Sequence, residues 1–66
     1  MAGAGRIGYR VLARWQEFAN QLVEERLVGE YDTDDACIQA MSDYSHQHKQ
    51  EIGTSLKGYT IIRFHE

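Results

Sequence analysis

The stretch LVEERLVGEYDTDDACIQAM, residues 22–41, decides the fold, because its hydrophobic pattern changes from that of a strand to that of a helix. Up to Tyr31 apolar and polar side chains alternate, as they also do along residues 9–18, and this alternation is typical of half-buried strands. The polar residues 32–35 end the alternation, and apolar residues then recur at spacings of three and four. The sequence therefore predicts two strands, paired as a hairpin, followed by a helix.

Four polar residues mark the start of the helix. Asp32 or Thr33 can cap it by accepting a hydrogen bond from a backbone N–H group. Asp34 and Asp35 fall in the first turn, where carboxylates interact favourably with the helix dipole. The apolar stripe expected to face the sheet consists of Cys37, Ala40, Met41, Tyr44 and His48. Gly53 is the expected end of the helix.

The C-terminal residues predict a third strand. Residues 54–58 indicate a short loop, and residues 59–65 a strand whose Ile62 and Phe64 point into the core. The helix is a crossover, so the third strand can lie beside the first and antiparallel to it. The expected fold class is α+β, a two-layer ββαβ unit with a three-stranded antiparallel sheet in the order 2-1-3 and one helix on one face.

The register of the hairpin follows from the apolar pattern, because a slip of one residue exchanges the faces of a strand. A two-residue loop would place Glu24 opposite Trp15 and so bring charge into the core. A loop centred on Asn20 instead places Leu27 opposite Ala13. With this register the expected core face consists of Tyr9, Val11, Ala13, Trp15, Val23, Leu27 and Tyr31, with Glu25 as its one charged member.

A single helix covers one side of the sheet, so the other side is open to solvent or to a partner. Arginine, aromatic and aliphatic side chains together are the composition of a protein interface core. The residues expected to form a partner-binding surface on this open side are Arg10, Leu12, Arg14, Phe18, Leu22, Arg26, Val28, Tyr59, Ile61 and Arg63.

The length of 66 residues allows one small domain with a small core. We expect this domain at residues 8–66, after a flexible tail at residues 1–7 that has little to bury. The single cysteine excludes an internal disulfide, which leaves self-association as a way to stabilise so short a chain. No apolar run approaches the roughly 18 residues of a membrane span, and no signal-peptide pattern is present, so a cytoplasmic location is expected.

The formal net charge is −3, but the charges are unevenly distributed. Residues 24–43 hold seven acidic side chains and one arginine, whereas arginines dominate residues 1–23. Such asymmetry bears on partners rather than on fold. The expected acidic surface consists of Glu24, Glu25, Glu30, Asp32, Asp34 and Asp35.

No pattern of chemistry-bearing residues indicates an enzyme, a metal site or a cofactor. His46 and His48 are two residues apart and leave a helix in different directions, whereas ligands on one face need spacings of three or four. Cys37 lies on the apolar stripe, where it acts as a small buried hydrophobe. A ligand pocket of ordinary size would also leave too little core in a chain this short.

Three hypotheses for function follow. The first is a non-enzymatic protein-binding module or small inhibitor, by analogy with the small acidic proteins of phages and other mobile elements, such as anti-CRISPR inhibitors. It would dock through its open sheet face, its acidic surface or the edge of the second strand onto a larger protein with a basic surface, such as one that handles nucleic acid.

The second hypothesis is a nucleic-acid-binding sheet, in which aromatic residues stack on bases and arginines meet phosphates. The acidic net charge weighs against it. The third is a structural homodimer, formed by packing of two sheets or by pairing of two edges of the second strand.

Overall fold

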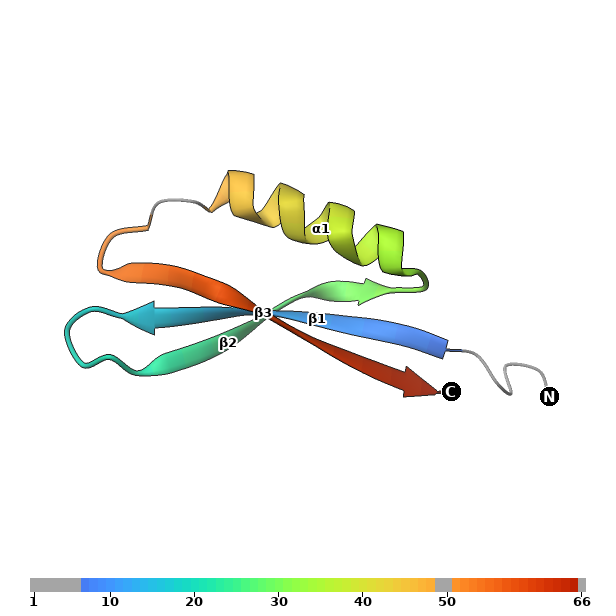
Figure 1. The fold of residues 1–66 in the computed structure, drawn as a ribbon. Helices are drawn as coiled ribbons and strands as arrows, with labels where there is room; N and C mark the ends of the chain where they lie inside the picture. Colours follow the sequence, from blue (N-terminus) through green and yellow to red (C-terminus); the bar gives the residue numbers. More distant parts are fainter. Residues whose placement is uncertain (1–6, 49–50, 66) are drawn as a thin grey trace.

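The computed structural model describes residues 7–48 and 51–65. Its elements, in chain order, are β1 at Ile7–Glu17, β2 at Val23–Tyr31, α1 at Asp34–Gln47 and β3 at Thr54–His65. The strands form one antiparallel sheet in the order β2-β1-β3 (Figure 1). The predicted ββαβ arrangement, the strand order and the α+β class are confirmed.

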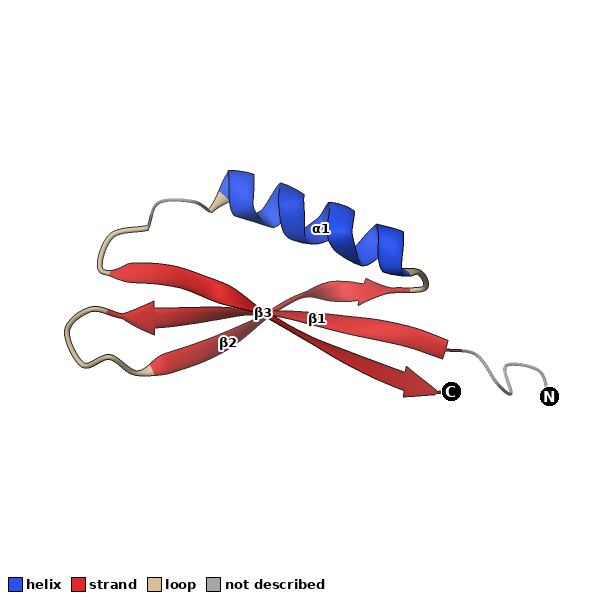
Figure 2. Cartoon of the chain, in the orientation of Figure 1, coloured by secondary structure: helices blue, strands red, loops and turns tan. Residues whose placement is uncertain are grey.

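The helix lies on one side of a twisted sheet, and no helix or strand of the described residues covers the other side (Figure 2). We call the two sides the helix face and the open face. Helix α1 has 14 residues and is therefore about 21 Å long, whereas the 12 residues of β3 extend over about 40 Å. The helix thus covers only about half the length of the sheet. No helix in the described part of the chain is long and apolar enough to cross a membrane.

The core is small. Its fully buried apolar side chains are Val11 and Ala13, at 0% exposure, Trp15 at 1% and Cys37 at 2%. The first three alternate along β1, so the central strand supplies most of the core, and the helix stripe that begins at Cys37 covers it. The central position predicted for β1 and the direction predicted for the stripe are confirmed.

The start of α1 was predicted correctly from the sequence, but its end was not. Thr33, one of the two predicted caps, is the N-cap, and its hydroxyl accepts a hydrogen bond of 3.1 Å from the Ala36 N–H. The helix ends at Gln47 with His48 as its C-cap, well before the predicted end at Gly53. Gly53 has a φ of +82° and lies in the turn that leads into β3. Glycine adopts this left-handed conformation without steric cost, so it serves the turn instead.

The hairpin uses both of the registers that the sequence allowed. Tyr9 pairs with Tyr31, as predicted, but Val28 is an extra residue that forms a β-bulge in β2. Beyond the bulge Trp15 pairs with Glu24, which is the register that the apolar pattern disfavoured. One inserted residue sends every following side chain of that strand to the opposite face.

Because of the bulge, two residues that were predicted to be in the core lie on the other face of the sheet. Leu27 and Val23 lie on the open face, where they are 60% and 59% exposed. The loop also differs in detail, since Gln21 and not Asn20 has the positive φ, at +59°. Asn20 stabilises the loop through its side-chain oxygen, which accepts a hydrogen bond of 2.9 Å from the N–H of Leu22.

The third strand begins earlier than predicted. Residues 54–58, expected to be a loop, belong to β3 and pair with the hairpin end of β1. Lys57 is an extra residue between the pairs that Leu56 and Gly58 form with β1, so β3 contains a bulge of its own. The predicted tail, residues 1–7, lies outside the described residues except for Ile7, where β1 begins.

Candidate docking surface

The open face is built on the even-numbered residues of β1. Arg10, Leu12 and Arg14 lie there, as predicted, because Val11, Ala13 and Trp15 between them are buried under the helix. Each of these even-numbered residues has one neighbour on β2 and one on β3. The neighbours are Glu30 and Ile62 for Arg10, Leu27 and Thr60 for Leu12, and Glu25 and Gly58 for Arg14.

Four apolar residues cross this face from edge to edge, and we call them the open-face stripe: Leu27 of β2, Leu12 of β1, and Ile62 and Phe64 of β3. Leu27 lies directly opposite Leu12, and Ile62 is the diagonal neighbour of Leu12 on the other side. Leu27 is 60% and Ile62 is 42% exposed. Since no element of the described chain covers these residues, the stripe is available for binding.

At one end of the open-face stripe, the ring of Phe64 packs over a glycine. Phe64 pairs with Gly8, and a Cβ at Gly8 would lie 2.5 Å from Cζ of the Phe64 ring, so the ring lies over the glycine. The Arg10 guanidinium carbon is 5.4 Å from the centroid of this ring, and Nε of Arg10 forms an ion pair of 2.7 Å with Glu30. The aromatic ring is therefore held in place between Gly8 and the guanidinium of Arg10.

The other end of the open face contains a shallow depression of about 630 Å³. It is lined by Arg14, Gln16, Val23, Glu25 and Lys57. A carboxylate oxygen of Glu25 accepts a hydrogen bond of 3.0 Å from the hydroxyl of Thr60, on the far strand. The open face therefore combines an apolar stripe with charges of both signs, namely Arg10, Arg14 and Lys57 against Glu25 and Glu30.

Three predicted docking residues, Tyr59, Ile61 and Arg63, lie instead on the helix face, because they pair with the odd-numbered residues of β1, which are on that side. The Tyr59 hydroxyl donates a hydrogen bond of 3.0 Å to the Met41 carbonyl oxygen. Along residues 59–64, the odd-numbered and the even-numbered positions both contain large apolar side chains, so the alternation could not decide which set faces inward. The prediction that Ile62 and Phe64 point into the core is wrong for the same reason.

Four further residues were assigned to the open face and lie elsewhere. Arg26 lies on the helix face with its guanidinium carbon 4.9 Å from the Trp15 ring centroid. Val28 forms the bulge and lines a groove beside the helix. Phe18 and Leu22 belong to the hairpin loop, where they are 65% and 63% exposed.

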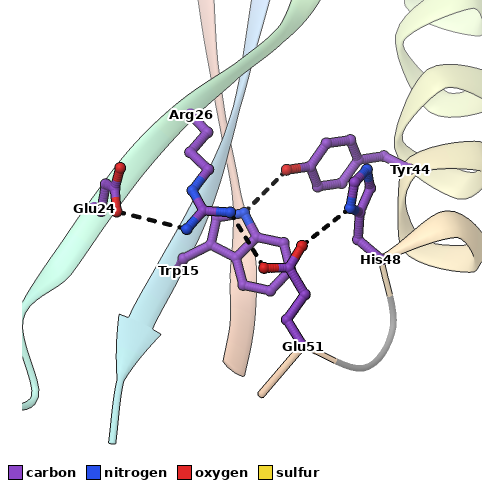
Figure 3. A network of polar contacts seen from close by, with 6 residues as sticks. All are labelled: Trp15, Glu24, Arg26, Tyr44, His48 and Glu51. Carbon is purple, nitrogen blue, oxygen red and sulfur yellow. Dashed lines mark hydrogen bonds and ion pairs between the residues drawn. The ribbon is translucent and has the colours of Figure 1, made fainter. Parts of the chain in front are cut away.

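A polar network on the helix face explains why Arg26 points inward (Figure 3). Its guanidinium lies 3.3 Å from Glu51 and 3.7 Å from Glu24. Desolvation lowers the pKa of Arg26, but the hydrogen bond to Glu51 and the charges of both carboxylates outweigh it, so the pKa is raised and the side chain stays charged. The other carboxylate oxygen of Glu51 lies 3.2 Å from Nδ1 of His48.

The aromatic part of this network joins the helix to the sheet. The indole N–H of Trp15 donates a hydrogen bond of 3.0 Å to the Tyr44 hydroxyl. The rings of Tyr44 and His48 lie 4.2 Å apart, centroid to centroid. We assign this network to stability, because its members hold the end of α1 and the turn after it against β1 and β2.

The predicted acidic surface is divided by the sheet. Glu24 lies on the helix face beside Arg26, whereas its neighbour Glu25 lies on the open face. Glu30 is also on the open face, in its ion pair with Arg10. Asp32 precedes α1, and Asp34 and Asp35 are exposed in its first turn. The carboxylates therefore do not form one continuous patch.

A groove of about 400 Å³ runs between α1 and β2. Small residues of the helix create it, since Ala36 and Ala40 line it opposite Val28 and Tyr31. The β2 edge that borders this groove is interrupted by the bulge at Val28. Addition of a regular strand at this edge would therefore meet a break in the hydrogen-bonding pattern.

Two further features of the described residues concern chemistry, the single thiol and the possible metal ligands. Burial raises the pKa of the Cys37 thiol, and the charge of Asp34 raises it further, so this thiol is unreactive. Within residues 7–48 and 51–65, no group of three or more histidine, cysteine or acidic side chains could hold a metal ion.

Comparison of the chain with protein-family models, with curated proteins and with solved structures found no match. A function can therefore be inferred only from the residues and geometry of this chain.

Sequence analysis missed the stripe residues Leu27, Ile62 and Phe64. One signal pointed to Phe64, because a glycine inside a strand, here Gly8, often marks the close approach of another group. For Leu27 the sequence offered no such signal, since its place depends on the bulge at Val28.

Proposed function

We propose that this protein is a non-catalytic binding module that docks on another protein through its open face. The observation that carries the proposal is the open-face stripe, four apolar side chains that cross all three strands and of which Leu27 and Ile62 are exposed. Such a stripe bordered by charged and polar residues has the composition of a protein interface, with an apolar centre and a polar rim.

The charges on the open face suggest the chemistry of the partner. Arg10 is paired with Glu30, but Arg14 and Lys57 form no ion pair with the described residues, although both are exposed. The rim at the hairpin end is therefore positive. A partner with an apolar patch bordered by carboxylates fits this face, and the charges would speed its association.

Nucleic-acid binding has less support. Tyr59 lies on the helix face with its hydroxyl bonded to the helix, and on the open face the ring of Phe64 lies under Arg10, so neither ring is free to stack on a base. Glu25 and Glu30 lie among the cations of the same face, so its positive charge is confined to Arg14 and Lys57 and does not extend along a phosphate backbone. A role as an inhibitor is one form of the proposed binding function, and its target would be the docking partner.

Two variants at residues whose wild-type side chains are equally exposed test the proposal. Leu27 on the open face and Ile38 on α1 are both 60% exposed, so Leu27→Asp and Ile38→Asp introduce the same charge at equally accessible places. The immobilised wild-type chain retains binding proteins from a lysate. We expect Leu27→Asp to lose these proteins and Ile38→Asp to retain them. Equal retention by both variants, with both folded by circular dichroism, would contradict the proposal.

A further inference from the structure

We propose that two copies of this chain pair through the outer edge of β3, which joins their sheets into one six-stranded antiparallel sheet. The inference concerns the edge of the sheet and not its open face, so it is independent of the proposed docking function. It follows from the direction of the backbone groups of β3 and from a difference between the two edges of the sheet.

The backbone direction follows from one hydrogen bond. The N–H of Glu17 donates to the carbonyl oxygen of Leu22, so the odd-numbered residues of β1 direct their backbone groups to β2 and the even-numbered ones direct theirs to β3. Thr60 and Ile62 pair with even-numbered residues and therefore bond to β1. The N–H and C=O groups of Tyr59, Ile61 and Arg63 consequently point away from the sheet.

The two edges differ in their protection against pairing. The β2 edge has a bulge at Val28 and three glutamates, and α1 lies beside it. In β3 the bulge at Lys57 lies near the N-terminal end, which leaves residues 59–64 uninterrupted, with no proline and no acidic residue. Exposed strand edges are usually blunted by bulges, prolines and charged side chains. Of these, residues 59–64 contain only Arg63, so β3 has the less protected edge, and this is where we expect a second strand to pair.

The side chains of β3 in one copy complement those of β3 in a second copy. In an antiparallel pair centred on Ile61, this residue lies opposite its own copy, and Tyr59 lies opposite Arg63 of the second copy. The aromatic ring and the guanidinium then form a favourable cross-strand pair on each side of the twofold axis. Centring on Arg63 would instead place two like charges opposite each other.

Exposure and space also favour this arrangement. Ile61 on the helix face and Ile62 on the open face are 48% and 42% exposed, so pairing would bury apolar surface on both sides of the new sheet. Helix α1 packs mainly on β2 and β1 and reaches β3 at Tyr59, so most of it lies away from the outer edge of β3 and the two helices stay apart. The open-face stripe ends on β3, so the stripes of the two copies would approach each other at the dimer axis.

Residues 59–63 make a strand pair of only about 17 Å, so we expect a reversible, concentration-dependent dimer. The test uses sedimentation velocity on chemically synthesised full-length chains. N-methylation of Ile61 removes one outward N–H and keeps the side chain. The matched control is N-methylation of Glu25, whose N–H points outward from β2, because it pairs with the even-numbered Arg14.

We expect the mass of the wild-type chain to rise toward twice the monomer value with concentration. N-methylation at Ile61 should keep it at the monomer value, and N-methylation at Glu25 should leave the rise unchanged. A wild-type chain that stays monomeric at every concentration, or an unchanged rise after N-methylation at Ile61, would overturn the proposal.

A second variant keeps the test decisive if N-methylation at Ile61 prevents folding. Ile61→Lys would place two ammonium groups opposite each other at the axis and should also give a monomer, whereas Ile38→Lys on α1 should dimerise normally. Dimerisation of a folded Ile61→Lys variant to the wild-type extent would overturn the proposed register.

Discussion

The indole N–H of Trp15 donates a hydrogen bond of 3.0 Å to the hydroxyl of Tyr44, which joins the central strand to the helix. Trp15 is 1% exposed, so water cannot replace the hydroxyl if it is removed. We expect Tyr44→Phe to lower the free energy of unfolding by about 1–3 kcal/mol, the cost of an unsatisfied buried donor. Urea denaturation measures this loss.

A double-mutant cycle separates this hydrogen bond from the packing of the rings. In a Trp15→Phe background no indole N–H remains, so Tyr44→Phe should then cost much less. An equal cost in both backgrounds would mean that the hydrogen bond contributes nothing to stability.

The bulge at Val28 places Leu27 outside the core, and this can be tested through stability. Leu27→Ser should change the free energy of unfolding of the monomer by roughly 0.5 kcal/mol or less, because the side chain is 60% exposed. Val11→Ala, at a position with 0% exposure, should cost about 1–3 kcal/mol, since it leaves a cavity in the core. Chemical denaturation at low protein concentration compares the two. If Leu27→Ser lowered the free energy of unfolding more than Val11→Ala does, Leu27 would be a core residue and β2 would have no bulge at Val28.

The N-cap of α1 gives a third prediction. Thr33→Ala removes the hydroxyl that accepts from the Ala36 N–H, and it should cost about 1 kcal/mol. Thr33→Ser keeps the hydroxyl and should be close to neutral. Thermal unfolding followed by circular dichroism distinguishes them, and equal melting temperatures for both variants would argue against this cap.

The buried thiol of Cys37 predicts a dependence of stability on pH. Its pKa is raised in the folded state by burial and by Asp34, so the folded protein binds the thiol proton more tightly than the unfolded chain does. The corresponding stability is present below the unfolded pKa of about 9 and is lost as the pH rises through and above it. Urea denaturation at neutral pH and at a pH above 9 measures this loss.

Other groups also titrate at high pH, so the comparison needs Cys37→Ala as its control. This variant lacks the thiol and should show a smaller decrease in stability between the two pH values. A decrease equal to that of the wild-type chain would mean that the thiol is not buried as described.

Much of the fold was predictable because local signals and the apolar pattern agree. The alternation along β1 identified the central strand and its buried side, and the polar residues before α1 identified the start of the helix. The crossover formed by α1 then fixed the strand order. In each case one physical reason, burial of a face or capping of a terminus, acts on neighbouring residues.

The docking surface was predicted less well, because its residues depend on two bulges. Val28 and Lys57 each add one residue to a strand, and no local pattern marks either position. The consequences are large, since Leu27 moves from the core to the open face. In β3, Tyr59 faces inward because its hydroxyl bonds to the helix, a long-range contact that strand alternation cannot show.

The proposed function requires that the open face, and not the helix, contacts another protein. The most direct measurement is site-specific photo-crosslinking in cells, with a photoreactive amino acid at Leu27 or at the equally exposed Ile38. We predict that the label at Leu27 crosslinks to a different protein and that the label at Ile38 does not. Crosslinks at Ile38 to the same protein, no crosslink at Leu27, or crosslinks at Leu27 only to a second copy of this chain would contradict the account.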